Sequence, residues 1–414
     1  MRFVTSLGAL LLASCSATDT PQPGVQRSER GDTSVVSVSG PGTWGTNVTL
    51  ERSAAFGTEE GNDSVTLGEI RALAMRGDRI VATDGQRFGI RVFDTMLVQV
   101  ALWGREGSGP GELRNPDGGL AIFIDGRVAV RDPGNARLQL FAPDGRSAGE
   151  WAVISGGLRT RDNFGMMGDT LLSRVVVTST GPIESWQYGL ARISTDGRVL
   201  DTVVFPSASR APVTLVARRG GNTAELPLPF APMALRVWHP RGGFAVANGE
   251  QYAITWRRLG GHIRVERTVD PVPVSDAEAA QERAVVTKGL QWLDPAWTWN
   301  GPAIPSRKPA LSALYVGADS TVWVLREGVA IAADDPEYEP GSPSSVERRL
   351  RSALSFDVWT ADGELLGTIP VPTGMQLHPQ PVFTRTGLVA LEIDTLGVPR
   401  VTRYRVRLGN RAPR

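Results

Sequence analysis

The side chains that could carry catalytic chemistry are few and far apart in this chain of 414 residues. None of the three histidines, His239, His262 and His378, is paired at a spacing typical of metal ligands, and we expect each at a surface or in a turn. No G-x-S-x-G nucleophile motif is present. We therefore predict no catalytic residue and no cofactor. Calcium held by single oxygen ligands from several strands would leave no motif, so the metal content stays open.

One group of residues has the composition of a ligand-binding site. Trp292, Trp297 and Trp299 lie outside the predicted repeat strands, and Arg307 and Lys308 follow them. Aromatic planes beside cationic donors suit a sugar ring, an aromatic ligand or a peptide. Trp292, Trp297, Trp299 and Arg307 are therefore candidate ligand-binding residues. The competing interpretation is that the tryptophans anchor an inserted helix to the rest of the fold.

The N-terminus predicts a location. A positive charge at Arg2 precedes a short apolar run, residues 3–12, that is too short to span a bilayer and has the form of a signal sequence. Residues 12–15 (LASC) resemble the lipobox of bacterial lipoproteins. The resemblance implies a signal peptide over residues 1–15 and lipid attachment at Cys15, the only cysteine. The alternative is an ordinary secretory signal.

By the sorting habit of that family, Ser16 implies the outer membrane of a bacterial cell envelope, on its periplasmic or surface face. Residues 16–33 are almost entirely polar, which predicts a flexible tether. The formal charge of +1 gives no global field for nucleic acid. The expected partners of this monomer are the membrane, through Cys15, and an envelope protein or a saccharide or peptide ligand.

Residues 103–151 have the pattern of one four-stranded unit. A glycine-rich lead-in is followed by three short alternating runs, and Asp-Gly pairs suited to tight hairpins separate them. This unit resembles an NHL repeat, the blade of one class of six-bladed β-propellers. The resemblance is carried by the spaced glycines, Pro116, residues 128–132 (VAVRD) and residues 135–141 (NARLQLF).

The end of the third strand of each blade serves as a marker for counting repeats. Six such markers occur, at Phe93, Phe141, Ile193, Trp256, Trp359 and Tyr404. They predict an all-β fold, a single six-bladed propeller over residues 34–410. The chain ends soon after the sixth marker, so the last blade lacks its outer strand. Apolar and polar residues alternate over residues 47–52, as in a strand. We therefore expect this N-terminal strand to complete the last blade and close the ring.

The widest gap between markers predicts an insertion between blades 4 and 5, at about residues 271–308. Ser275 and Glu278 form a capping box, Ala-rich sequence follows, and Gly289 can end the helix. A second excursion, residues 332–346, is acidic and rich in proline, and its role is open. Insertions in a propeller lie on its rims, where function is usually carried.

These features predict a lipid-anchored β-propeller of the cell envelope that acts as a non-catalytic ligand-binding or protein-interaction module. The alternative is a divalent-cation-dependent hydrolase or lyase, lactonase-like, with its site at the central channel. That alternative depends on analogy of fold. A docking role in an envelope assembly complex is a third possibility.

Overall fold

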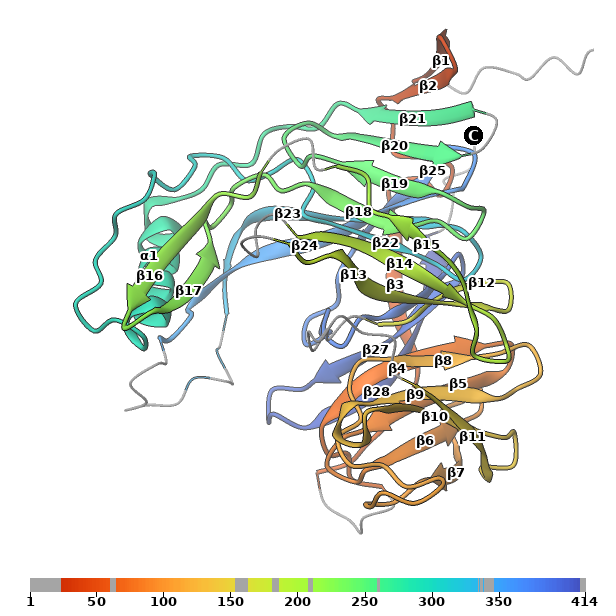
Figure 1. Ribbon diagram of the computed structural model, residues 1–414. Coiled ribbons are helices and arrows are strands. Elements are labelled where there is room, and N and C mark those ends of the chain that lie inside the picture. Colours follow the sequence, from red (N-terminus) through yellow and green to blue (C-terminus); the bar gives the residue numbers. More distant parts are fainter. Residues whose placement is uncertain are drawn as a thin grey trace, which may run out of the picture.

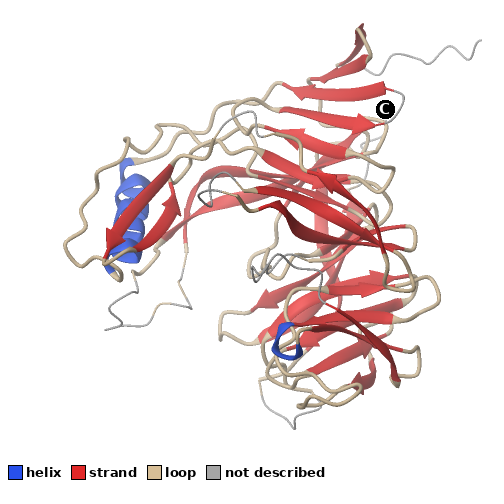
Figure 2. Cartoon of the chain, viewed as in Figure 1, coloured by secondary structure: helices blue, strands red, loops and turns tan. Residues whose placement is uncertain are grey.

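The computed structural model describes residues 24–59, 65–152, 163–180, 186–207, 211–258, 261–333, 335, 338 and 346–409. The predicted signal peptide, Cys15 and the first part of the predicted tether lie outside these ranges. The regular secondary structure is almost entirely β-strand (Figure 2), and one α-helix, α1 (Asp276–Gln291), occurs in the described part. Over the same ranges, no helix is long and apolar enough to cross a membrane.

Six sheets form the blades of a propeller (Figure 1), as predicted. Blade 1 contains β4 (Ile70–Arg76), β5 (Arg79–Asp84), β6 (Gly89–Phe93) and β7 (Gln99–Trp103). Blade 2 contains β8 (Leu120–Ile122), β9 (Val128–Asp132), β10 (Arg137–Phe141) and β11 (Ser147–Ala152). Blade 3 contains β12 (Gly165–Met167), β13 (Thr170–Thr178), β14 (Gln187–Ile193) and β15 (Val199–Val204).

The second half of the chain supplies the other three blades. Blade 4 contains β18 (Leu235–Trp238), β19 (Phe244–Ala247), β20 (Ala253–Arg258) and β21 (Gly261–Arg267). Blade 5 contains β22 (Ala313–Val316), β23 (Val322–Ala332), β24 (Leu350–Trp359) and β25 (Leu365–Pro370). Blade 6 contains β26 (Val382–Thr384), β27 (Gly387–Ile393), β28 (Pro399–Leu408) and β3 (Val48–Phe56). All six sequence markers lie in the third strand of their blade.

The ring is closed by a strand from the start of the chain, as predicted. β3 pairs with β28 in antiparallel register, from Val401 opposite Phe56 to Leu408 opposite Val48. The closing strand is longer than the predicted residues 47–52 because the pairing continues to Phe56. The outer edge of β28 is thereby covered.

The prediction of a flexible tether over residues 16–33 is wrong for the second half of that range. Residues 25–33 lie in a hairpin of β1 (Val25–Arg30) and β2 (Thr33–Val38), and β2 pairs in parallel with β21. Composition was misleading here because β1 is polar and largely exposed, whereas β2 buries Val35, Val36 and Val38. The edge of β21 supplies the backbone partners that make this segment ordered.

Between the two N-terminal pairings, the chain also bonds to blade 5. The backbone N–H groups of Thr43 and Trp44 donate to the carbonyls of Leu365 and Leu366, at 3.1 and 2.6 Å. We call residues 33–56 the N-terminal strap, because they follow the outer edges of blades 4, 5 and 6 in turn.

Most neighbouring blades are joined by a buried apolar cluster, as expected for sheets that stack face to face. Pairs that represent these clusters are Leu73 and Val401 for blades 6 and 1, Trp103 and Phe141 for blades 1 and 2, Phe123 and Leu171 for blades 2 and 3, Trp256 and Trp359 for blades 4 and 5, and Phe356 and Phe383 for blades 5 and 6. Within the described ranges, no such cluster joins blades 3 and 4.

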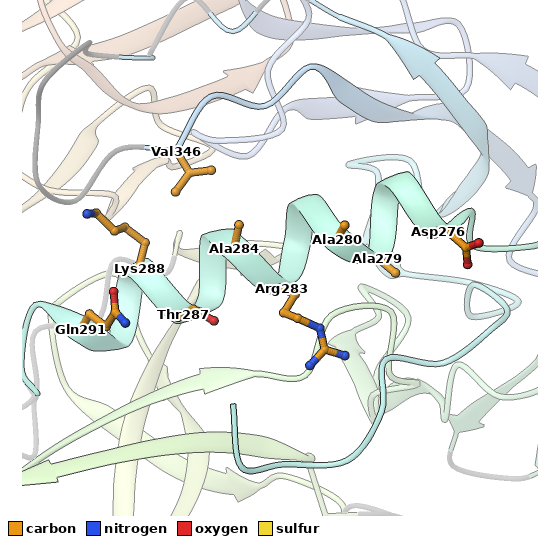
Figure 3. A pocket seen from close by; sticks show the side chains of 9 residues that line it. All are labelled: Asp276, Ala279, Ala280, Arg283, Ala284, Thr287, Lys288, Gln291 and Val346. Atoms are coloured by element: carbon orange, nitrogen blue, oxygen red, sulfur yellow. The ribbon is translucent and has the colours of Figure 1, made fainter. Parts of the chain in front are cut away.

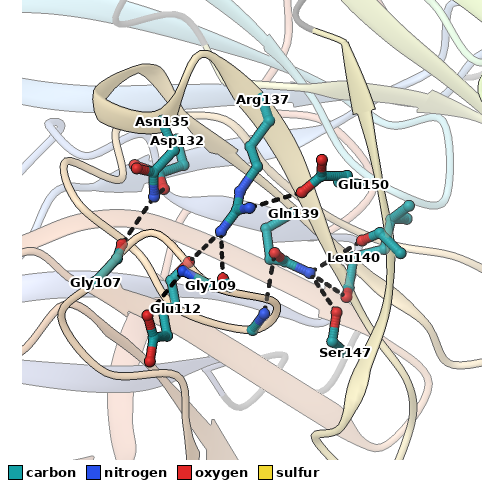
Figure 4. Close-up of polar contacts among 12 residues, drawn as sticks. Gly107, Gly109, Glu112, Asp132, Asn135, Arg137, Gln139, Leu140, Ser147 and Glu150 are labelled. Carbon is teal, nitrogen blue, oxygen red and sulfur yellow. Dashed lines mark hydrogen bonds and ion pairs between the residues drawn. The ribbon is translucent and has the colours of Figure 1, made fainter.

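The glycine-rich lead-in to blade 2 is held by polar side chains of that blade (Figure 4). The Asp132 carboxylate accepts hydrogen bonds from the backbone of Arg114 and Asn115. Arg137 donates to the carbonyls of Gly109 and Glu112, at 2.6 and 2.9 Å. The residues that carry the sequence resemblance therefore fix the loop that leads into their own sheet.

A second, smaller core lies beside the ring. It is made by the hairpin β16 (Thr214–Arg219) and β17 (Asn222–Pro227), by α1, and by the loop that follows α1 (Figure 1). We call this unit the accessory module. Its centre contains Leu215, Leu290 and Trp297. The hairpin is inserted between blades 3 and 4 and the helix between blades 4 and 5, so two insertions fold against each other.

Candidate functional site

The structure does not bring the four candidate ligand-binding residues together. Trp297 is only 4% exposed, and its indole N–H donates to the carbonyl of Val216 at 3.0 Å. Trp299 packs edge-on against Trp297, and the guanidinium of Arg283 lies 4.4 Å from its ring centroid. These two tryptophans fix α1 and its loop to the β16–β17 hairpin, which is the role that the competing interpretation gives them.

The other two candidates differ from these. Trp292 follows the last turn of α1 and is 70% exposed. Arg307 is exposed, and its backbone forms an isolated bridge with Pro273. Of the four, Trp292 presents a large apolar surface to solvent.

The next residue, Lys308, is buried and ties α1 to blade 5. Its ammonium group contacts the carboxylate of Glu278 at 2.6 Å and donates to the carbonyl of Gly328 and the hydroxyl of Ser352. Burial raises the pKa of Glu278, but hydrogen bonds from Lys308 and from the cap residue Ser275 outweigh this effect and lower it. The predicted capping box at Ser275 and Glu278 is confirmed.

An open groove of about 610 Å³ runs along the outer side of α1. Figure 3 shows Val346 above Ala284 and Lys288 at one side, and Arg283 extending from the other side. Alanines at 279, 280 and 284 keep the floor of the groove low, while Asp276, Thr287, Lys288 and Gln291 supply polar groups at its margins. The groove is therefore mixed in character, with charges at both ends of an apolar floor.

A second hollow, of about 200 Å³, lies between blades 3 and 4. One line of residues crosses its blade 4 wall from strand to strand: Arg236, Val246, Thr255 and Arg264 lie directly opposite one another on β18, β19, β20 and β21. Arg257, on the same face of β20 as Thr255, also lines the hollow. We call this region, with its blade 3 wall, the 3/4 seam.

The blade 3 wall of the seam brings a further guanidinium and an aromatic ring. Arg174 lies over Tyr188 at 4.6 Å, and both Arg174 and Arg236 face the ring of Phe205, at 5.9 and 5.2 Å. Burial lowers the pKa of Arg236, and the positive charge of Arg174 lowers it further. Two like charges therefore lie close together beside this hollow.

A third hollow, of about 460 Å³, adjoins the seam at Gln251, Ala253 and Arg264. Its other wall is the N-terminal hairpin, which contributes Gln26, Ser37 and Ser39. Here Glu266 accepts from the guanidinium of Arg264 at 2.6 Å.

Polar groups elsewhere are arranged as structural pairs. Burial raises the pKa of Asp117 although the guanidinium of Arg131 contacts it at 2.7 Å. Within the part of the chain that the structure describes, no three His, Cys, Asp or Glu side chains lie together as a metal site would require.

Sequence reasoning missed the 3/4 seam. On β18 and β21, Arg236 and Arg264 alternate with apolar residues, as solvent-facing side chains of any half-exposed strand do. Strand register, which places these arginines on one line across the four strands of blade 4, is not visible in the sequence. Arginine is far more common than lysine throughout the chain, so the arginines of the seam do not stand out by residue type.

Comparisons with known proteins give resemblances of shape at low identity. No family model and no curated protein sequence matches the chain. A Bacteroides fragilis protein whose name describes it as exported is 11% identical, with a TM-score of 0.47, and the match covers 91% of this chain and 100% of that one. A gluconolactonase of Xanthomonas campestris is 11% identical, with a TM-score of 0.38, over 89% and 92% of the two chains.

A virginiamycin B lyase of Staphylococcus aureus is 10% identical, with a TM-score of 0.35, over 87% and 99% of the two chains. Values this low carry no argument about activity, and the strand pairings themselves establish the six-bladed propeller.

Proposed function

We propose that this protein is a lipid-anchored β-propeller of the bacterial cell envelope whose accessory module docks a partner without catalysis. The observation that carries the proposal is that the two insertions form a core of their own and leave Trp292 70% exposed, one residue after Gln291, which lines the open groove of α1. An exposed aromatic residue beside a groove with charged margins is the composition of an interaction surface. The partner is an envelope protein, or a peptide or saccharide.

The propeller supports this surface through polar contacts. Lys308 joins Glu278 of α1 to Gly328 and Ser352 of blade 5, and the side chain of Gln281 bonds the backbone of Arg349 and Leu350. These contacts hold α1 in a fixed orientation, which lowers the entropic cost of binding.

The location and the repeat type belong to the same proposal. Anchoring depends on the resemblance of residues 12–15 to a lipobox, and the assignment of blade 2 as an NHL repeat depends on its motif residues. Replacement of Cys15 by serine is expected to release the protein from the membrane fraction. Unchanged retention of Cys15→Ser after carbonate extraction would contradict lipid anchoring.

Docking is tested with a photoactivatable amino acid placed at position 292 in cells that produce the full chain. We expect a discrete crosslinked species that is lost when Arg283 and Lys288 are both changed to glutamate. The matched control carries the same amino acid at position 124, because Ile124 is 66% exposed on the turn between β8 and β9. Equal crosslinking from positions 292 and 124 would refute a specific surface at α1.

The alternative, a metal-dependent hydrolase or lyase, makes a different prediction. It requires a bound divalent cation near the channel, which elemental analysis of the purified protein detects, and a fall in melting temperature on chelation. The docking proposal predicts no effect of chelation on crosslinking at position 292.

A further inference from the structure

We propose that the 3/4 seam binds the carboxylate or phosphate group of a small polar molecule through Arg236, Arg257 and Arg264. This site is separate from the accessory module, and the inference goes beyond the docking function proposed above.

The first observation is that the seam carries more charged side chains than the other blade contacts, although Phe205 packs edge-on against Phe244 across it, with ring centroids 5.6 Å apart. Blades 4 and 5 meet through Ala245, Trp256 and Ile263, which lie on the opposite face of the same sheet. On the seam face, the corresponding line begins and ends with arginine. Polar side chains at a contact between sheets give up stability that apolar ones would supply, so their presence calls for another role.

The second observation is an excess of positive charge. The lining of the 200 Å³ hollow contains three arginines and neither aspartate nor glutamate. Arg264 is paired with Glu266, and Arg236 donates to the carbonyl of Pro206 at 2.8 Å. Arg257 has no hydrogen-bond or ion-pair partner among the described residues. Arg174, behind Phe205, adds a fourth guanidinium. An oxyanion placed here would relieve this repulsion and accept charge-assisted hydrogen bonds.

The third observation is the size and polarity of the space. A volume of about 200 Å³ is smaller than pockets that enclose a whole drug-sized ligand. The lining of the adjoining hollow of about 460 Å³ includes the hydroxyl and amide groups of Ser37, Ser39, Gln26 and Gln251, together with the charged groups of Arg264, Glu266 and Arg267. A molecule with its anionic group in the seam and a hydroxyl- or amide-bearing body in the adjoining hollow fits both spaces.

Calorimetric titration of the full chain tests this inference, with inorganic phosphate and succinate as separate probes and ionic strength held constant with sodium chloride. We expect one of the two anions to bind at a single site. Arg257→Gln should weaken that binding about ten-fold or more, because a charge-assisted hydrogen bond is lost. Arg257→Lys, which keeps the charge but loses the fork of donors, should weaken it less.

The control is Arg146→Gln, because Arg146 is an exposed arginine of blade 2 paired with Asp144 at 3.7 Å. This variant should bind as the unsubstituted protein does. Preference for phosphate or for succinate identifies the anionic group, and either result supports the site. The inference is overturned if neither anion binds beyond the effect of chloride, or if Arg257→Gln and Arg146→Gln bind equally well. Because Arg257 has no partner to lose, Arg257→Gln should have the same melting temperature as the unsubstituted protein. This measurement separates a loss of binding from a loss of folding.

Discussion

The two faces of blade 4 are built from the same four strands and meet their neighbours in opposite ways. Toward blade 5, Val237, Ala245, Trp256 and Ile263 lie opposite one another and are packed in an apolar cluster. Each of these four residues has a sequence neighbour that points toward blade 3. These neighbours form a second line, which consists of Arg236, Val246, Thr255 and Arg264. Since side chains of a strand alternate between faces, one sheet can hold the ring together on one side and carry arginines among its aromatic side chains on the other.

The largest expected effect lies on the apolar face. Trp256 is fully buried between blades 4 and 5. Trp256→Ala should lower the free energy of unfolding by about 3–5 kcal/mol, because it leaves a large cavity in the core. Urea unfolding followed by circular dichroism measures this loss.

Trp238→Ala is the matched variant on the seam face, where Trp238 is half-buried against Phe244. It should lower the free energy of unfolding by less than Trp256→Ala does. Equal losses would mean that both faces of blade 4 contribute equally to stability, and the comparison would fail.

A smaller effect is expected from a hydroxyl inside the apolar face. The Tyr252 hydroxyl accepts a hydrogen bond from the Trp359 indole at 2.9 Å. Tyr252→Phe should cost about 1–3 kcal/mol, because a buried N–H loses its partner. Burial, and then the negative charge of Asp357, raise the pKa of Tyr252 well above 10.

The raised pKa of Tyr252 fixes the direction of the pH effect. Its contribution to stability is fully present below pH 10, the value for the unfolded chain, and is lost as pH rises from there toward the folded-state pKa. Alkaline pH should therefore destabilise the unsubstituted protein more steeply than Tyr252→Phe. Burial likewise raises the pKa of Tyr315 to about 12, so some alkaline loss remains in the variant. Parallel curves of unfolding free energy against pH would contradict this assignment.

The smallest effect is expected at the centre of the polar line. The Thr255 hydroxyl has no hydrogen-bond partner among the described residues, so Thr255→Val should change the free energy of unfolding by less than about 0.5 kcal/mol. Phosphate or succinate binding should weaken in the same variant, as measured by calorimetry. A clear gain in stability with unchanged binding would show that the seam behaves as an ordinary apolar contact.

The fold could be predicted from the sequence because each blade repeats a local pattern. Third strands that end in a turn, such as residues 141–145 and 359–363, mark the blades, and the missing outer strand of blade 6 required a donor near the N-terminus. Short-range alternation and turn chemistry carry this information.

The candidate site could not be predicted to the same depth, because it depends on contacts between distant segments. Trp297 and Trp292 look alike in the sequence, yet only Trp297 finds the β16–β17 hairpin, whose strands come from a different insertion. Likewise, the β-hairpin that contains residues 25–33 depends on pairing with β21, which lies more than two hundred residues later in the chain.

The N-terminal strap has a consequence for how the chain is made. It leaves the ribosome before the strands it pairs with, because its partners are β21, β25 and β28, and Ser53 bonds the backbone of Arg403, 350 residues away. Pairings of such long sequence separation form late and slowly. Translation must therefore deliver blade 4 before β2 can pair and blade 6 before β3 can pair. A chain that stops short of β28 would leave β3 without its partner, so the pairing of β3 with β28 forms only when the last blade has been made.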